Sequence, residues 1–319
     1  MIEASGLRRT YRTSTGIVRR RMVSVEAVRG VDLDIGEGEL FGLLGPNGAG
    51  KTTTIKMLIT LLAPTAGTAR VLGFDVVDES QRVRERIGYV FGGDRGLYDR
   101  LSGFDNLRYF AELYRVPARE QRRRIEELLE LVGLKGRERE RVEGYSRGMR
   151  QRLHIARGIL HDPPVVFLDE PTIGVDPVGA RELRATIGNL TAAGKTVLLT
   201  THYMFEADAL CDRIAVIADG RIVGDGTPAE LKRLVATGSV VEIETFGIPP
   251  EIVDGLRTTA GVASLVVEER EQAQVLVVQS QDGTPPTQAL LAQLSEFRVG
   301  RVSAREPTLE DAYVQLVKS

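Results

Sequence analysis

The chain has 319 residues, of which 42% are apolar and 27% charged, and its formal net charge is -2 at pH 7. Such a length predicts about two globular domains, and the near-zero charge gives no reason to expect nucleic acid as a partner. No apolar run approaches the roughly 18 residues of a membrane span, Cys211 is the only cysteine, and residues 1–4 carry no signal-like pattern, so we expect a cytoplasmic protein.

Near the N-terminus, apolar residues alternate with polar ones between residues 25 and 35. This period of two is typical of a half-buried strand and predicts an antiparallel sheet in this part of the chain. The stretch before it, residues 8–21, contains six arginines and no acidic residue. Two interpretations are open, namely contact with anionic lipid headgroups and a solvated hairpin tip.

A glycine-rich loop follows the apolar run at residues 40–44 and leads into a helix expected over residues 51–62. It fits G-x-x-x-x-G-K-[ST], a phosphate-binding motif in which glycines let consecutive N–H groups point at a phosphate. The start of the helix adds the positive end of its dipole. We expect Lys51 to reach the outer phosphates and Thr52 to help hold Mg²⁺. The loop residues are Gly45, Pro46, Asn47, Gly48, Ala49, Gly50, Lys51, Thr52 and Thr53.

The middle of the chain changes from helical to alternating patterns. Residues 105–134 show helical periodicity, with charged residues on the outer face. Helices are then expected near 149–160 and 178–191, and strands at 165–168, 196–200 and 213–217. This alternation predicts an α/β fold with a mostly parallel sheet, whose ligand lies at the carboxyl ends of the strands.

We place a domain boundary near Thr237 and Gly238, with a first domain over 1–236 and a second over 238–319. The second region reads strand, helix, strand, strand, helix, strand, with a closing helix after Pro307. That order predicts a small ferredoxin-like α+β domain.

A second chemical pattern is an apolar strand that ends in two carboxylates, Asp169 and Glu170. Asp169 is suited to hold Mg²⁺, and Glu170 to take a proton from the water that attacks the terminal phosphate. Together with the phosphate loop this pattern predicts nucleotide hydrolysis.

With these motifs, residues 1 to about 235 resemble the nucleotide-binding subunit of an ATP-binding cassette (ABC) transporter. Residues 145–151 are similar to the family signature Leu-Ser-Gly-Gly-Gln, with Ser146 and Gly148 retained and Arg147 in place of the first glycine. Ser146 is also a good helix N-cap, which favours an anion site. The resemblance implies the P-loop NTPase fold of ABC ATPases with a helical subdomain at about 95–160. It also implies a head-to-tail dimer in which each signature closes over the partner's ATP.

Three further positions match the family. Asp176 lies in the loop expected to cross the dimer interface, and His202 resembles the switch histidine that contacts the terminal phosphate. Tyr11 resembles the aromatic residue that stacks on adenine, although the sequence also allows an ordinary core aromatic here. His154 and His161 are interpreted as structural.

One position departs from the family. Where a glutamine is usual, this chain has Gly92, Gly93 and Asp94. Either backbone and water replace the glutamine or Asp94 ligates Mg²⁺. The following residues, 96–101, correspond to the surface that receives a helix of the membrane subunit, with ordinary packing as the alternative.

The sequence therefore predicts an ATPase subunit that binds ATP and Mg²⁺, pairs with a second copy and drives a separate integral membrane permease of the ABC-2 type from the cytoplasmic face of the membrane. The ending, residues 305–313, resembles the daunorubicin-resistance type of exporter and implies export of a drug, lipid or glycoconjugate. A soluble ABC-type switch not coupled to transport is the alternative. A binding module without turnover is disfavoured by Glu170.

Overall fold

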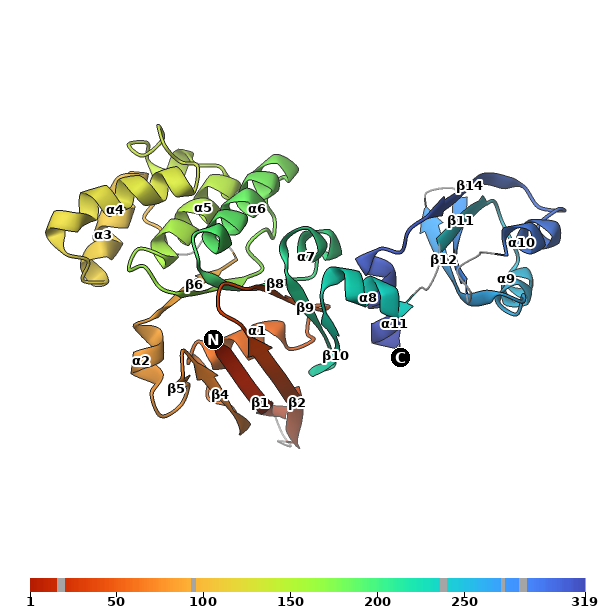
Figure 1. Cartoon of the computed structure of the whole chain (residues 1–319), viewed down its shortest axis with the longest axis horizontal. Helices are drawn as coiled ribbons and strands as arrows, with labels where there is room; N and C mark the ends of the chain where they lie inside the picture. The colour runs from red at the N-terminus through yellow and green to blue at the C-terminus, as the bar shows by residue number, and fades with distance from the viewer. Residues whose placement is uncertain (16–20, 93–95, 236–239, 271–272, 281–285, 319) are drawn as a thin grey trace. The chain divides into compact units, whose positions relative to one another are not determined.

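The computed structural model describes residues 1–15, 21–92, 96–235, 240–270, 273–280 and 286–318. The chain divides into two compact units, Met1–Thr227 and Pro228–Ser319. Two sheets belong to the first unit and one to the second (Figure 1). Within the described ranges, no helix is both long and apolar enough to cross a membrane.

The first sheet of unit 1 is antiparallel, with strand order β2-β1-β4-β5. β1 (Ile2–Thr15) and β2 (Arg21–Ile35) form a long hairpin. Arg8, Arg9, Arg12 and Arg21 of the arginine-rich stretch therefore lie on paired strands, whereas Arg19 and Arg20 lie outside the described residues. β4 (Ala66–Val71) pairs with β1, and the two-residue β5 (Phe74–Asp75) completes the sheet. The expected antiparallel sheet is present.

The second sheet has the order β10-β9-β3-β8-β7-β6, and its pairs are parallel except for β9 with β10. β3, β7 and β8 are buried along their whole length, as expected for a parallel sheet covered on both faces. Their carboxyl ends therefore meet at one edge. The strands are β3 (Leu40–Leu44), β6 (Ile87–Phe91), β7 (Val165–Asp169), β8 (Thr196–Thr201), β9 (Arg213–Ala218) and β10 (Arg221–Gly226).

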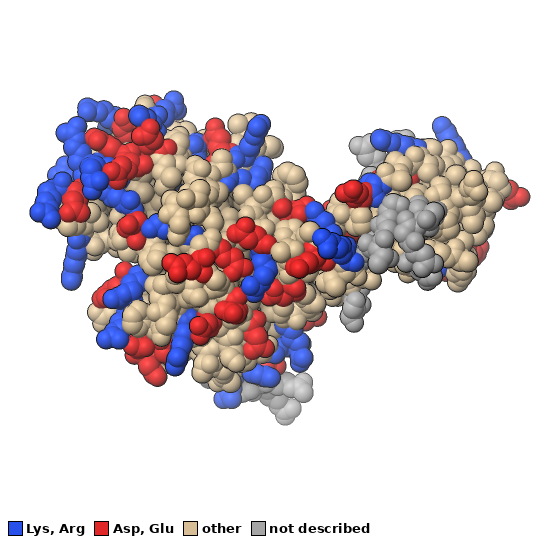
Figure 2. Space-filling view, viewed as in Figure 1, with Lys and Arg blue, Asp and Glu red and all other residues tan. Residues whose placement is uncertain are grey.

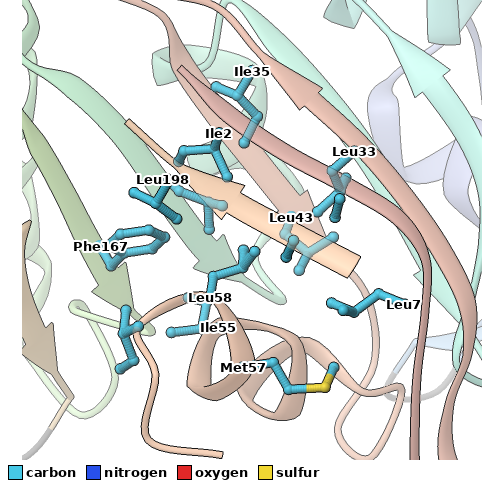
Figure 3. Close-up of a cluster of buried hydrophobic side chains, with 14 of the residues drawn as sticks. Ile2, Leu7, Leu33, Ile35, Leu43, Ile55, Met57, Leu58, Phe167 and Leu198 are labelled. Atoms are coloured by element: carbon cyan, nitrogen blue, oxygen red, sulfur yellow. The ribbon is translucent and has the colours of Figure 1, made fainter. Parts of the chain in front are cut away.

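Helix α1 (Lys51–Leu58) lies between these two sheets and joins their cores (Figure 3). Ile55 and Leu58 belong to one buried cluster with Phe167 and Leu198 of the parallel sheet and with Ile2 of the hairpin. This packing anchors the helix that starts at the glycine-rich loop. The helix ends at Leu58, earlier than the expected residue 62.

The remaining helices of unit 1 include the expected helical region at residues 105–134, which consists of two helices. α3 and α4 are separated by a turn in which Arg115 has a φ of 57° and which ends at Pro117. On α4, Arg122 and Glu126 form the expected i,i+4 pair at 3.0 Å, and Figure 2 shows both signs of charge mixed over this region. The helices are α2 (Ser80–Arg84), α3 (Gly103–Leu113), α4 (Ala118–Leu131), α5 (Arg147–Gly158), α6 (Pro177–Ala192) and α7 (Met204–Leu210).

Unit 2 contains an antiparallel sheet with strand order β12-β13-β11-β14. Together with the element order strand, helix, strand, strand, helix, strand, this is a ferredoxin-like arrangement. α8 packs against α11. The elements are α8 (Pro228–Val235), β11 (Val240–Thr245), α9 (Pro250–Arg257), β12 (Val262–Arg270), β13 (Ala273–Ser280), α10 (Thr287–Gln293), β14 (Val299–Arg305) and α11 (Leu309–Lys318).

Candidate active site

The glycine-rich loop connects the end of β3 to the start of α1 at the carboxyl edge of the parallel sheet. Gly48 and Gly50 have φ angles of 85° and 109°, which favour glycine. A Cβ atom at Gly50 would lie 2.6 Å from the carbonyl oxygen of Ala27 on β2, so close packing also requires glycine there. The outer residues Pro46, Asn47 and Gly48 are exposed. The loop therefore packs against β2 at Gly50 and is open to solvent at residues 46–48.

Lys51 turns its side chain back into this loop. Its Nζ donates to the carbonyl oxygens of Gly45 at 2.7 Å and Pro46 at 3.2 Å, and it forms an ion pair with Glu170 Oε1 at 3.0 Å. Only 4% of Lys51 is exposed. A buried positive charge is therefore fixed beside the loop, where its main-chain and carboxylate partners offset the cost of desolvation.

Asp169, the last residue of β7, meets the first turn of α1. The hydroxyl of Thr52 lies 3.2 Å from Asp169 Oδ1, and the hydroxyl of Thr200 on β8 lies 2.6 Å from the same oxygen. The structure thereby joins the predicted metal-binding residues Thr52 and Asp169. Thr53 follows on α1 and is half-buried.

Glu170 lies directly after β7 and contacts both of its predicted catalytic neighbours. Its Oε2 is 2.9 Å from Nδ1 of His202, which follows β8, while its Oε1 faces Lys51. Its φ of 49° is unusual for a residue with a side chain. An acid, a lysine and a histidine from three segments far apart in the sequence therefore form one cluster.

Ser146 and Asp176 each begin a helix. Ser146 Oγ accepts the N–H of Met149 at the start of α5, and Asp176 accepts those of Val178 and Gly179 at the start of α6. The two helix starts lie close together, because a Cβ atom at Gly148 would be 3.1 Å from Gly179 Cα. Neither Ser146 nor Asp176 has a hydrogen bond to the glycine-rich loop among the described residues.

The comparisons with known proteins agree with this geometry. The family model described as ABC transporter matches residues 28–173. The chain is 44% identical over 202 residues to the ABC transporter ATP-binding protein NatA of Bacillus subtilis (strain 168), covering 63% of this chain and 82% of that protein. This chain belongs to the ATP-binding proteins of ABC transporters.

Similarity to this family extends through unit 2. The daunorubicin resistance ATP-binding protein DrrA2 of Streptomyces coeruleorubidus is 39% identical over 308 residues, covering 96% of this chain and 95% of that protein. A dimeric post-hydrolysis structure of the ATP-binding cassette MJ0796, bound to ADP and Pi, matches with a TM-score of 0.61 at 26% identity and covers 71% of this chain and 98% of that one. The expected ABC ATPase fold, the ATPase activity and the resemblance to daunorubicin-resistance-type proteins are confirmed.

In this ABC ATPase, Tyr11 lies on β1 of the hairpin. It pairs with Val25 on β2, two residues before Ala27, whose carbonyl oxygen packs against Gly50. The guanidinium of Arg9 lies 5.0 Å from the centre of the Tyr11 ring. The ring is half-exposed, so its role in stacking on adenine stays a prediction.

Gly92 belongs to the segment where ABC ATPases usually have a glutamine, and it contacts the backbone of the turn at Asp169 and Glu170, which we call the acid turn. Gly92 N–H donates to the carbonyl oxygen of Asp169 at 2.7 Å. Gly93 and Asp94 lie outside the described residues, so the interpretation of Asp94 as a metal ligand stays a prediction.

Sequence reasoning missed Thr200. It singled out the residues of the motifs and did not consider a hydroxyl within a buried strand. The available signal was a threonine at the carboxyl end of an apolar strand, which is the ligand side of a parallel sheet.

Proposed function

We propose that this chain hydrolyses ATP as one half of a head-to-tail dimer and that dimer closure and opening drive a separate membrane permease for export. The observation that carries the chemistry is the position of Glu170 between Lys51 and His202, at 3.0 Å and 2.9 Å. A carboxylate so placed beside a phosphate loop fits a general base for water attack on a terminal phosphate.

The loop and α1 supply the nucleotide-binding groups. Main-chain N–H groups of the loop and of the first turn of α1 bind the phosphates, and Lys51 neutralises negative charge on the outer ones. Thr52 and Asp169 fit Mg²⁺ because both present oxygen donors, 3.2 Å apart, at the start of the helix. Mg²⁺ held there would neutralise charge that develops on the β- and γ-phosphates.

The ion pair between Lys51 and Glu170 suggests how ATP prepares the site. A terminal phosphate competes with Glu170 for Lys51, because both are anions that bind the same ammonium group. Glu170 then accepts the proton of the attacking water, while the oxygen of that water bonds to the γ-phosphorus and the bond to the β-phosphate oxygen breaks. His202 contacts the other carboxylate oxygen of Glu170, and we expect it also to contact the γ-phosphate.

A second copy would complete the site. The N-terminus of α5 carries Ser146 and presents the positive end of the helix dipole, which favours an anion. In a head-to-tail dimer this N-terminus and Gly148 approach the γ-phosphate of the partner, and Asp176 lies at the interface. The dimeric structure of MJ0796 supports this arrangement, since that cassette shares the fold at 26% identity.

An exposed aromatic surface near the start of the helical subdomain suits the membrane subunit. Tyr98 and Tyr109 are 47% and 42% exposed, and their ring centres lie 5.0 Å apart. Leu101 and Leu113 add 36% and 58% exposed side chains. Apolar and aromatic residues that are preassembled in this way favour docking of an amphipathic helix. We infer that a helix of an ABC-2-type permease docks here and holds this subunit at the cytoplasmic face of the membrane.

The class of cargo follows from the relatives. One full-length relative is named for resistance to daunorubicin, and another, 31% identical over 318 residues, for resistance to linearmycin. We therefore infer that the permease exports a drug, while the wider class of a drug, lipid or glycoconjugate rests on the resemblance of residues 305–313 to the exporter branch.

The test compares the wild-type protein with Glu170→Gln. Because the amide cannot accept the water proton, we expect turnover to fall about 100-fold or more while ATP binding persists and a dimer accumulates. Steady-state phosphate release and light scattering with ATP and Mg²⁺ measure both effects. Equal turnover in the two proteins would contradict the mechanism. Hydrolysis without binding to a co-expressed permease would instead favour the uncoupled switch.

A further inference from the structure

The hydroxyl of Thr200 connects the two acids of the active site. Thr200 lies near the carboxyl end of β8 and is 0% exposed. Its Oγ1 donates to Asp169 Oδ1 at 2.6 Å and accepts the main-chain N–H of Glu170 at 3.0 Å. A hydroxyl has a single proton to donate, and here that proton goes to Asp169. The buried hydroxyl of Thr200 therefore forms hydrogen bonds with both the carboxylate of Asp169 and the backbone of Glu170.

The backbone at Glu170 needs this support. Its φ of 49° lies in the left-handed region, which costs free energy for a residue with a Cβ atom. The N–H of Glu170 is held from two directions, by Thr200 Oγ1 and by the carbonyl oxygen of Thr200 at 3.1 Å. This turn directs the Glu170 side chain toward Lys51 and His202.

The sheet topology explains why this threonine reaches both acids. β7 and β8 are parallel neighbours, and Asp169 pairs with Thr200 in register. Paired residues of neighbouring strands project to the same face, so the hydroxyl meets the carboxylate directly. A valine would fill the same space and would lose both interactions of the hydroxyl.

We propose that Thr200 is a positioning residue that orients Asp169 and Glu170 together, an inference that rests on the hydrolytic function proposed above. The hydroxyl fixes the carboxylate that would hold Mg²⁺ and, through the backbone, the carboxylate that receives the proton. The two acids are thereby aligned by one bond network before ATP arrives, which is how preorganised sites lower the barrier to reaction.

The first experiment measures kcat and KM for ATP in Thr200→Val and Thr200→Ser. Loss of a hydrogen bond to a charged group in the site predicts a fall in kcat of about 10- to 100-fold for the valine variant. KM should change less than about threefold, since the phosphate loop is intact. The serine variant, which keeps the hydroxyl, should recover most of the activity. A valine variant with wild-type kcat, or a serine variant as slow as valine, would overturn the inference.

Thr196→Val is the matched control. Thr196 lies on the same strand, is 0% exposed and uses its hydroxyl to accept the N–H of Gly38 at 2.9 Å. The substitution therefore removes a buried hydroxyl from β8 at the end away from the acids. We expect a lower Tm and a kcat within about twofold of wild type. If Thr196→Val loses as much kcat as Thr200→Val, general weakening of the strand is the cause and the inference is wrong.

A second experiment measures the Mg²⁺ requirement of nucleotide binding and does not depend on ATP hydrolysis. In the Glu170→Gln background, binding of a fluorescent ATP analogue is titrated with Mg²⁺ in the presence and absence of Thr200→Val. Misorientation of Asp169 should raise the half-saturating Mg²⁺ concentration about three- to tenfold, and Thr196→Val should leave it unchanged. An unchanged Mg²⁺ requirement in Thr200→Val would contradict the positioning of Asp169. Failure of the proposed function is seen separately, as equal ATPase rates in wild type and Glu170→Gln.

Discussion

Gly92 donates its main-chain N–H to the carbonyl oxygen of Asp169 at 2.7 Å, which ties the end of β6 to the acid turn. A Cβ atom at position 92 would lie 2.5 Å from the carbonyl oxygen of Glu170. This contact involves backbone, so no side-chain rotation relieves it. The close approach of the two strand ends therefore requires glycine at position 92, within the segment where the family usually has a glutamine.

From this contact we expect Gly92→Ala to lower kcat about fivefold or more, because Glu170 must move to admit the methyl group. Gly92→Gln, which introduces the amide side chain usual in this segment of the family, should be no more active than alanine. The control is Gly188→Ala on α6, where a Cβ atom meets nothing within 4 Å and alanine favours the helix. Wild-type turnover in Gly92→Ala would show that the acid turn tolerates the displacement.

Arg147 joins the signature helix to the loop before α6. Its Nη1 donates to the carbonyl oxygen of Gly174 at 2.9 Å, so the residue that replaces a family glycine connects two segments assigned to the dimer interface. We expect Arg147→Ala to weaken ATP-dependent dimerisation about five- to tenfold while the affinity of the monomer for ATP is unchanged. Sedimentation of the Glu170→Gln background with ATP measures the first and fluorescence titration the second. Arg123→Ala, on the exposed face of α4, is the control, and equal dimerisation of the two variants would contradict this role.

The active-site residues were predictable where chemistry is encoded in short segments. The phosphate loop and the pair Asp169 and Glu170 each lie within a few consecutive residues, and the structure brings them together as their motifs imply. The contacts of Thr200 and Gly92 could not be predicted in this way. Their contacts arise because β8 and β6 flank β7 in the sheet, and strand order depends on long-range packing that no local pattern reports.

The helices and strands likewise differ in how far the sequence predicts them. Long amphipathic or apolar segments such as α4 and β3 were recognised, since their periodicity is set by burial on one face or on both. The two-residue β5 and the five-residue α2 were missed, because so few residues contain no complete period. The sequence prediction for residues 105–134 gave helical periodicity without placing the break at Arg115 and Pro117, because apolar residues continue on both sides of it.

In unit 2, the C-terminal segment 305–313, which resembles the exporter branch, forms a hydrogen-bonded cluster with β11. Arg305 makes hydrogen bonds to both carboxylate oxygens of Asp311, at 2.6 Å and 3.0 Å, and to Glu242 on β11 at 2.7 Å. Thr308 caps α11 and also bonds Asp311. Burial alone would raise the pKa of Asp311, but the hydrogen bonds from Arg305 and Thr308 outweigh it and hold that pKa below its ordinary value. The cluster therefore fastens α11 to the sheet.

We expect Arg305→Ala to destabilise α11 by about 2 kcal/mol, since it leaves the partly buried carboxylate of Asp311 without its cation. Hydrogen exchange of residues 309–317 in the full chain should accelerate by more than tenfold, with little change in α1. Arg301→Ala is the control, because the side chain at 301 is exposed on the neighbouring part of β14. Unchanged exchange in Arg305→Ala would show that apolar contacts alone hold the helix.

His154 makes the stability of unit 1 sensitive to acid. It is 1% exposed on α5, and burial, with the charges of Arg157 and Arg150, lowers its pKa from 6.5 to about 4. The unfolded chain therefore takes up a proton at a higher pH than the folded protein does. Stability from this group is complete above the unfolded pKa and is lost as pH falls from about 6.5 toward 4.

By pH 5 this loss amounts to roughly 2 kcal/mol. His154→Leu removes the titration, so its free energy of unfolding should fall less than that of wild type between pH 7.5 and pH 5. Urea denaturation of both proteins at the two pH values measures the difference. Burial also lowers the pKa of His161, so a smaller dependence should persist in the variant. Equal losses in the two proteins would mean that His154 accepts a proton in the folded state, in conflict with its burial.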